Sequence, residues 1–328
     1  MSQPTETVAL SPEIQLRIQK QRALDNAFRY VTLSFALLVL LILGGVIISL
    51  VEGSLPALRK FGFDFLTTER WNPVTEVFGA RAAIYGTLMT SLIAMIVGIP
   101  VSFGIAIFLT ELAPEWLKRP IGTAIELLAG IPSIIYGIWG LFVLAPFLQR
   151  NIQPVIIAVF ADVPGLSSFF GGPPYGIGIF TAGLILGIMV LPFITSVTRD
   201  VFETVPALLK ESAYGLGATT WEVVWQIVIP YTRVGLVGGV MLGLGRALGE
   251  TMAVTFVIGN AHRISPSVLA PGTTISASIA NEFTEAVGEI YTSALVALGL
   301  LLFVITFTVL AMAKLMLIRM QRNAGARS

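Results

Sequence analysis

The stretch ESAYGLGATTWEVVWQIVIP, residues 211–230, is a polar and amphipathic interruption in an otherwise apolar chain. Pro206 permits a turn just before it, and the residues that follow suit a short amphipathic helix. Gly217 allows the chain to turn again, and Pro230 ends the helical pattern before the next apolar run. This pattern fits a helix that docks a soluble partner, and it also fits a loop helix that packs on its own protein.

The composition around this stretch is that of an integral membrane protein. Of 328 residues, 55% are hydrophobic and 12% are charged, and the mean hydropathy is +0.86. A helix needs roughly 20 apolar residues to cross the hydrocarbon core of a bilayer. The sequence therefore predicts an all-α, polytopic bundle of about six transmembrane helices, near residues 30–51, 82–110, 120–148, 176–198, 232–258 and 291–316.

Residue usage excludes several classes of chemistry. The chain has no cysteine and one histidine, so disulfides, thiol catalysis and ordinary His/Cys zinc sites have no residues to form them. The net charge is +1, and the basic residues are scattered at predicted helix ends, which argues against a nucleic-acid partner. We find no arrangement of nucleophiles, metal ligands or paired carboxylates typical of a membrane enzyme.

The amino-terminal region is predicted to be anchored in the membrane. The apolar run 30–51 is longer than the roughly 7–15 apolar residues of a cleavable signal, so we expect it to be retained. The polar residues before it suit either a frayed tail or an amphipathic helix on the membrane surface. We therefore divide the chain into four parts: 1–29 as a cytoplasmic tail or amphipathic helix, 30–81 as the first transmembrane helix with an external loop, 82–316 as the transmembrane core with a cytoplasmic loop at 199–231, and 317–328 as a cytoplasmic tail.

The distribution of lysine and arginine predicts the orientation. If the amino terminus is cytoplasmic, most of the basic residues lie inside, including those of the 199–231 loop and of both termini. Three longer segments, 52–81, 149–175 and 259–290, then face outward. Near their ends, Trp71 and Tyr291 fit aromatic anchors at a membrane interface.

Charged residues occur inside two predicted spans. The fifth span contains GLGRALGETMAV, residues 243–254, which places Arg246 and Glu250 four residues apart on one predicted helix face. A charge at this depth costs several kcal/mol unless it is paired or hydrated, and it marks a pathway by default. Arginine suits an anion, whereas a structural ion pair explains the same two residues. Glu126 in the third span is a second candidate, for the pathway or as a hydrogen-bonded helix partner.

Small residues recur at helical spacing in the fourth and fifth spans. Pairs four apart let helices approach closely, so we expect packing faces at Gly183 with Gly187, Gly239 with Gly243, and Gly245 with Gly249. The chain has no Gly-Lys dipeptide and so cannot form the standard G-x-x-x-x-G-K-[ST] phosphate-binding loop. Any ATP that drives this protein must be bound and hydrolysed by another polypeptide.

The spacing in residues 211–230 resembles the EAA loop of ABC importer permeases, E-A-A-x3-G-x9-I-x-L-P. Ser212 replaces the second position of that pattern and Ile229 replaces its leucine. In the family, this loop couples the permease to an ATP-binding subunit. The resemblance implies an ATPase-docking role for Glu211, Ser212, Ala213, Gly217, Ile227 and Pro230.

Further segments are similar to the phosphate-specific ABC importer permeases, over most of residues 62–258. They are WNP at 71–73, FGA with IYGTLMTS within 78–91, ELLAGIPSIIYG at 126–137, IMVLPFI at 188–194 and GRALGETMAV at 245–254. The ending Thr251-Met252-Ala253-Val254, with the order of the flanking segments, resembles the PstC-type subunit rather than its PstA-type partner. Residues 1–29 lie outside the resemblance.

The resemblance implies the type I ABC importer permease fold, in a multi-pass protein of a bacterial inner membrane with both termini cytoplasmic. It also implies a PstA-type second permease, two copies of an ATP-binding subunit, a phosphate-binding protein, no cofactor of its own, and alternating access. Arg246, Glu250 and Glu126 are then the candidate substrate pathway. The alternatives are an ABC permease for another oxyanion, and a secondary anion transporter, which gives no reason for the 211–230 spacing.

Overall fold

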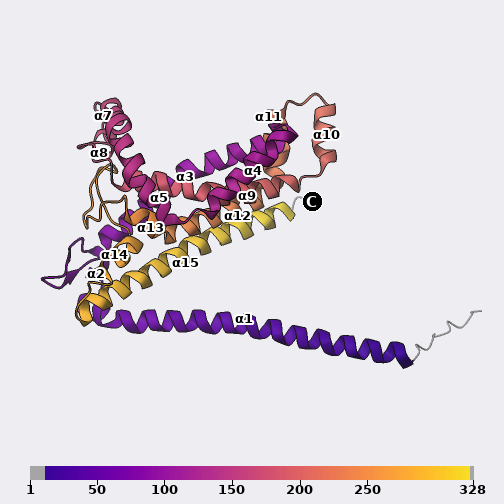
Figure 1. Cartoon of the computed structure of the whole chain (residues 1–328), viewed down its shortest axis with the longest axis horizontal. Helices are drawn as coiled ribbons and strands as arrows, with labels where there is room; N and C mark the ends of the chain where they lie inside the picture. Colours follow the sequence, from indigo (N-terminus) through magenta and orange to yellow (C-terminus); the bar gives the residue numbers. More distant parts are fainter. Residues whose placement is uncertain (1–11, 326–328) are drawn as a thin grey trace, which may run out of the picture. The chain divides into compact units, whose positions relative to one another are not determined.

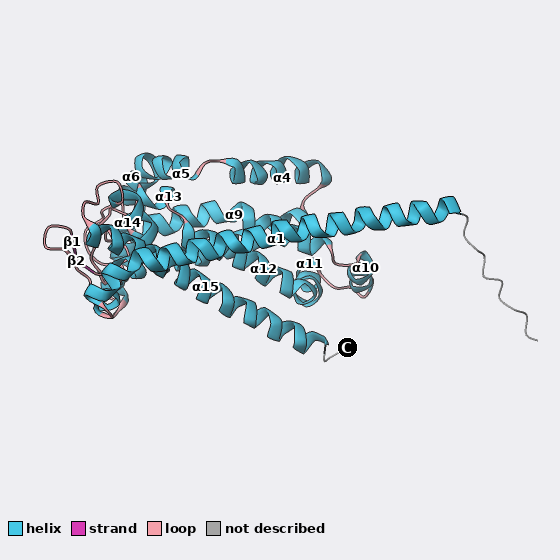
Figure 2. Ribbon diagram, turned by 90° about the horizontal axis from the view of Figure 1, so that it is seen from below, coloured by secondary structure: helices cyan, strands magenta, loops and turns pink. Residues whose placement is uncertain are grey.

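A computed structural model describes residues 12–325 of the chain, and these residues are mostly helical (Figures 1 and 2). Within them, six helical segments are long and apolar enough to cross a membrane: Lys20–Phe61, Arg81–Leu112, Ser133–Phe160, Ile179–Glu203, Thr220–Gly249 and Glu289–Arg319. The predicted all-α bundle of about six transmembrane helices is confirmed.

The elements follow one another along the chain with a single small hairpin among the helices. The α-helices are α1 (Pro12–Phe61), α2 (Asp64–Thr67), α3 (Arg81–Ile107), α4 (Glu115–Gly130), α5 (Ser133–Trp139), α6 (Ala145–Phe147), α7 (Gln153–Phe160), α8 (Leu166–Phe169), α9 (Ile179–Glu203), α10 (Ala207–Gly215), α11 (Thr220–Val223), α12 (Ile229–Gly249), α13 (Met252–Thr255), α14 (Ile275–Glu282) and α15 (Glu289–Gly325). Short π-helical turns are η1 (Phe108–Leu112), η2 (Gly140–Leu144), η3 (Leu148–Ile152) and η4 (Val224–Val228). The strands β1 (Trp71–Asn72) and β2 (Val77–Phe78) pair antiparallel.

The chain divides into two units, with the boundary between Glu52 and Gly53. The described part of the first unit is the amino-terminal part of α1. This helix continues without a break across residues 29 and 30, so no turn separates the predicted surface helix from the predicted span at 30–51. Residues 1–11 of the predicted tail lie outside the described residues.

Glycines bring the central helices of the second unit together. A Cβ atom on Gly183 of α9 would lie 2.6 Å from Ile93 of α3, and one on Gly243 of α12 would lie 2.7 Å from Ile194 of α9. Gly187 and Gly239 also lie against neighbouring helices, as predicted. The prediction is wrong for Gly249, because no heavy atom among the described residues comes within 4 Å of its Cβ position.

Two predicted spans are interrupted. The third, 120–148, breaks after Gly130, because Pro132 has no N–H to donate and disfavours helical backbone at Ile131. Glu126 therefore lies on the separate helix α4. The fifth, 232–258, ends as a helix at Gly249, and the short helix α13 begins after Glu250 and Thr251.

The second unit has two distinct ends (Figure 1). α10 and α11 lie at one, which we call the loop end. Helices α2, α7, α8 and α14 lie at the other, which we call the cap end. The cap end gathers the three longer segments that the charge distribution predicts on one side, and backbone contacts such as Val268 N to Phe169 O, 3.0 Å, join two of them.

Glu282 holds the cap end together. Its carboxylate accepts hydrogen bonds from the Trp71 indole N–H and from the Tyr291 hydroxyl, at 2.8 Å for the latter, and lies 2.7 Å from His262 Nε2. The Trp71 and His262 rings stack, with 5.3 Å between centroids. Trp71 and Tyr291 thus have bonding partners inside the protein, in addition to the anchoring role predicted for them.

Candidate functional site

The two interrupted spans meet inside the helix bundle. Gly137, one turn into α5, lies directly against α13: a Cβ atom there would come 3.1 Å from the Met252 carbonyl oxygen and 3.1 Å from the Ala253 Cα. Non-helical backbone inside a membrane protein is tolerated where it is buried or lines a cavity, and transporters use such broken helices for their substrate sites. The paired breaks therefore form a candidate site.

Tyr136 bridges the first break. Its hydroxyl donates a hydrogen bond of 2.9 Å to the backbone oxygen of Leu128 at the end of α4, which also accepts a longer hydrogen bond of 3.4 Å from the Ile131 N–H. An apolar pocket of about 330 Å³ lies beside it, lined by Leu128, Ile131, Ile135, Tyr136, Trp139 and Ile188. Tyr136 is not among the site residues predicted from the sequence; the signal for it was its place four residues after Pro132.

Arg246 lies in the last turn of α12 and is half-buried. The carbon of its guanidinium lies 4.2 Å from the centroid of the Phe193 ring on α9, a cation–π contact worth about 0.5–2 kcal/mol. Its Nε is buried and has no hydrogen-bond partner within the described part of the chain. A guanidinium carries five N–H donors, so Arg246 has donors available for a ligand.

Glu250 does not lie where the sequence predicts it. It follows the last helical residue of α12 with extended backbone, φ −68° and ψ 134°, so it does not share a helix face with Arg246. Its Oε1 accepts a hydrogen bond of 3.3 Å from the backbone N–H of Ala253 at the start of α13. No Arg246–Glu250 ion pair occurs among the residues that the structure describes. Glu250 thus stabilises the second break.

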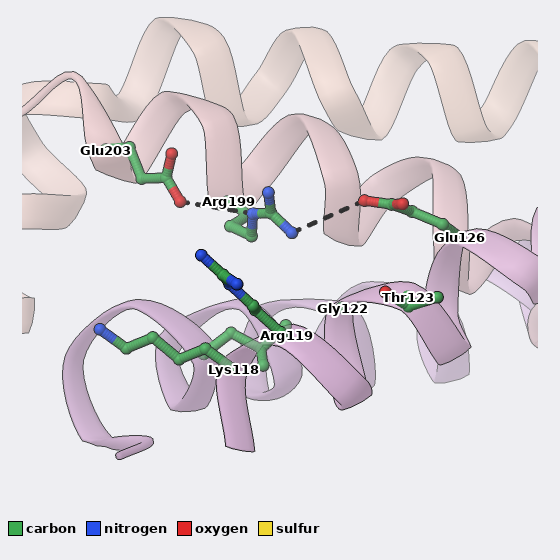
Figure 3. Close-up of a pocket in the computed structure, with 8 residues that line it drawn as sticks. Lys118, Arg119, Gly122, Thr123, Glu126, Arg199 and Glu203 are labelled. Atoms are coloured by element: carbon green, nitrogen blue, oxygen red, sulfur yellow. Dashed lines mark ion pairs between the residues drawn. The ribbon is translucent and has the colours of Figure 1, made fainter. Parts of the chain in front are cut away.

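Glu126 lies apart from these residues. Its carboxylate is 3.8 Å from Nη1 of Arg199 on α9, and 66% of its side chain is exposed. It lines a pocket of about 300 Å³ between α4 and α9, together with Lys118, Arg119, Gly122, Thr123, Arg199, Glu203 and Leu109 (Figure 3). Glu126 therefore has an ion-pair partner on a neighbouring helix, at a distance too long for the hydrogen bond that the structural alternative expects.

The predicted docking residues lie at the loop end. Glu211, Ser212 and Ala213 belong to α10, and Leu208 and Leu216 beside them are 72% and 90% exposed. Glu211, Ser212, Gly217 and Pro230 are exposed as well. Neither leucine lies in a candidate membrane span, so their exposure is consistent with a surface that a partner covers. This surface can receive one.

A tight turn follows α10. Gly217 has φ +90°, a conformation that favours glycine, and there is open space at its Cβ position. Thr219 then begins α11 with a capping box, in which Thr219 Oγ1 accepts from the Glu222 N–H and the Glu222 carboxylate accepts from the Thr219 N–H. The predicted turn at Gly217 is confirmed.

Two predicted docking residues face inward. Ala213 and Ile227 pack against a cluster of buried residues that contains Ala106, Phe202 and Val223. They attach α10 and η4 to the bundle, so their contribution to a docking surface is indirect.

A partly buried ion pair also holds α10 on the bundle. Lys210 Nζ lies 2.5 Å from Oε1 of Glu111 in η1, and the two side chains are only 19% and 6% exposed. Sequence reasoning missed this pair, because 99 residues separate its members. Among the described residues, no group of three or more His, Cys, Asp or Glu side chains could hold a metal ion.

Comparison with known proteins identifies relatives over nearly the whole chain. Residues 98–322 match the family described as "Binding-protein-dependent transport system inner membrane component". The chain is 68% identical to the phosphate transport system permease protein PstC of Mesorhizobium japonicum, over 92% of each chain. It is 59% identical to that of Pasteurella multocida, over 93% of this chain and 95% of the relative.

Solved structures are similar in fold. A bacterial ABC transporter involved in the import of the acidic polysaccharide alginate superimposes with a TM-score of 0.60 at 19% identity, covering 92% of this chain and 99% of that one. The MetNI methionine ABC transporter in an inward-facing conformation gives a TM-score of 0.53 at 15% identity, over 73% of this chain and 94% of that one. At such identities the likeness concerns the fold alone.

Proposed function

Because this chain belongs to the family of binding-protein-dependent transport system inner membrane components, we propose that it is the permease subunit of an ATP-driven importer of inorganic phosphate. Its fold is that of the type I ABC importer permeases. The observation that carries the proposal is the exposed helix α10, with the spacing of a docking loop, at one end of a membrane-spanning bundle. The similarity to the PstC relatives supports phosphate as the cargo and the PstC type of subunit.

The permease itself has no enzymatic role in this proposal. A separate ATPase, present in two copies, binds ATP and docks on α10 through Glu211, Ser212, Gly217 and Pro230, while Ala213 and Ile227 hold that surface in place. ATP binding closes the two ATPases, and the motion is passed to the bundle through α10. A PstA-type permease completes the pathway. A phosphate-binding protein delivers the anion at the cap end.

The phosphate pathway passes the paired helix breaks. Arg246 can donate two parallel hydrogen bonds to phosphate oxygens, since its guanidinium remains charged and has free donors. Glu250 keeps the break open by capping α13, and its negative charge keeps anion binding weak enough for release. Glu126 would meet the anion only at the loop end, where it lies beside Arg199.

We place the protein in the bacterial inner membrane with the loop end and both termini in the cytoplasm. The excess of lysine and arginine in the segments predicted to lie inside supports this orientation. The ATPase must also be on that side, because ATP is available there.

Co-purification tests the proposal. The tagged chain is expressed with an ATP-binding subunit, a second permease and a phosphate-binding protein of the same transport class, solubilised, and isolated by its tag. We expect the ATPase to be retained, with phosphate-stimulated ATP hydrolysis when the binding protein is added. A chain that is stable, folded and always isolated without an ATPase would contradict it.

A further inference from the structure

A cluster of basic side chains lies at the loop end, separate from Arg246. The pocket of about 300 Å³ between α4 and α9 holds three cationic groups, Lys118, Arg119 and Arg199, against two carboxylates, Glu126 and Glu203. Figure 3 shows Arg119 extending from α4 toward Arg199 and Glu203 on α9. Among the side chains that line the pocket, the cations therefore outnumber the carboxylates by one.

The hydrogen-bonding capacity of Arg199 is not satisfied. Its Nη1 lies 3.8 Å from Glu126, too far for a hydrogen bond, and its Nε lies 3.3 Å from Glu203 without hydrogen-bond geometry. Nε is buried and has no hydrogen-bond partner within the described part of the chain, although it forms an ion pair with Glu203. A buried donor without a partner is costly, so this geometry favours an additional acceptor in the pocket.

The carboxylates do not close the pocket. Glu126 and Glu203 are 66% and 60% exposed, so water screens their attraction to Arg199 and little free energy is lost when an anion replaces them. Among the described residues, Lys118 is paired only with Glu115, whose side chain is 90% exposed. Arg119 has no hydrogen bond or ion pair to any described residue. An incoming anion would thus compete only with exposed carboxylates for Lys118 and Arg199, and with no ion-pair partner among the described residues for Arg119.

The backbone leaves room for Arg199. A Cβ atom on Gly122 would lie 3.1 Å from Arg199 Nη1, closer than most side-chain contacts, so the absence of a side chain at 122 lets the guanidinium reach α4. Two arginines and a lysine converging from two helices form the donor set that suits a phosphate group, with arginine supplying paired hydrogen bonds and lysine a point charge.

We propose that Lys118, Arg119 and Arg199 form a phosphate-group site at the loop end of the bundle. The ligand is a tetrahedral phosphate group, carried either by free inorganic phosphate or by the headgroup of an anionic lipid, since basic residues on the cytoplasmic side also attract such headgroups. The assignment of this end to the cytoplasm, and of phosphate as cargo, rests on the proposed function.

Cysteine labelling tests the site. The chain contains no cysteine, so Thr123→Cys places one reactive thiol at the pocket, on an exposed position of α4. Gln226→Cys is the matched control, exposed on η4 outside the pocket. The full chain is placed in nanodiscs of phosphatidylcholine, and alkylation by neutral N-ethylmaleimide is timed with phosphate or with potassium chloride at equal ionic strength.

We expect phosphate to slow the alkylation of Thr123→Cys severalfold and to leave Gln226→Cys unchanged. Adding Arg199→Gln should raise the half-protecting phosphate concentration about tenfold or more, because one charge-assisted hydrogen bond is lost. Nanodiscs that contain phosphatidylglycerol and no free phosphate form the second arm. Protection in that arm alone identifies the lipid headgroup as the source, and protection by phosphate alone identifies the free anion.

The site is overturned if Thr123→Cys is alkylated at the same rate under all of these conditions, or if protection survives in the Arg119→Gln and Arg199→Gln double variant. The readout does not depend on transport. Protection in a chain that imports no phosphate contradicts the proposed function and leaves the site standing. Phosphate import by a complex whose pocket is never protected contradicts the site alone.

Discussion

Arg246 is the residue on which phosphate transport is expected to depend. Its guanidinium rests on the Phe193 ring with Nε unpartnered, beside two helix breaks, and its predicted partner Glu250 is engaged with α13 instead. This arrangement favours the pathway interpretation of Arg246 over a structural ion pair with Glu250. The pathway role itself remains a prediction.

Replacing Arg246 by Gln should lower phosphate uptake by at least about tenfold, since a charged donor to the anion is lost. Assembly of the complex should be unchanged. Uptake of radiolabelled phosphate and co-purification of the ATPase measure the two effects. Arg233→Gln is the control, an exposed arginine early in α12, and should transport normally. Full uptake by Arg246→Gln would remove this residue from the pathway.

Gly217→Leu should weaken ATPase binding while the bundle stays folded. Leucine at φ +90° costs about 1–2 kcal/mol locally and moves the exposed turn after α10, where open space allows the change. Gly62→Leu is a matched control, because Gly62 also has positive φ and open space but lies away from the loop end. Recovery of ATPase is measured for both variants. Equal recovery would count against docking at this turn.

At the scale of elements, α10 is held by the ion pair between Lys210 and Glu111 and by the inward packing of Ala213. We expect Glu111→Gln to loosen α10 by up to about 3 kcal/mol, because it leaves a partly buried lysine without its counter-charge. Backbone hydrogen exchange over 207–215 should then accelerate. Glu115→Gln, which removes an exposed ion pair on α4, should have no such effect.

A Glu111→Leu and Lys210→Met double variant separates charge from packing. It removes both buried charges together, so hydrogen exchange in α10 should return toward the wild-type rate. An α10 that exchanges at the wild-type rate in Glu111→Gln would show that apolar packing alone holds the docking helix.

Hydropathy predicted the spans but not their interruptions. Residues 126–137 and 245–258 are apolar on both sides of each break, so a hydropathy pattern continues through Pro132 and Glu250. Pro132 ends α4 for a local reason that hydropathy does not register, whereas the short helix α13 after the second break lies against Gly137 of α5, a residue distant in sequence. The turn at Gly217 could be predicted from the sequence, because its geometry depends on the glycine itself. The inward direction of Ala213 and Ile227 follows from neighbours distant in sequence.

At the scale of the whole molecule, the cap end is expected to weaken in acid. Burial raises the pKa of the Glu282 carboxyl, but the bonds from His262, Tyr291 and Trp71 outweigh it and hold the pKa below its ordinary value of 4.5. A depressed pKa adds stability above the pKa of the unfolded state, and this stability is lost as the pH falls through the folded-state pKa.

Glu282→Gln should therefore lower the free energy of unfolding by about 1–3 kcal/mol near neutral pH, because the carboxylate's partners lose a charged acceptor. The difference in free energy of unfolding between this variant and the wild type should shrink as the pH falls below 4.5. Thermal unfolding of the solubilised chain across this range measures it. Glu285→Gln, an exposed change on the same segment, is the control. A difference that is constant with pH would contradict the assignment.

The energy source for uptake tests the central claim most directly. The chain is reconstituted into proteoliposomes with its second permease, ATPase and binding protein, with ATP supplied on the side of α10 and phosphate with the binding protein on the side of the cap end. We predict that phosphate moves to the α10 side only with ATP, and that collapsing the proton and sodium gradients leaves the rate unchanged. Uptake by the chain alone, driven by an ion gradient and indifferent to ATP, would contradict the account.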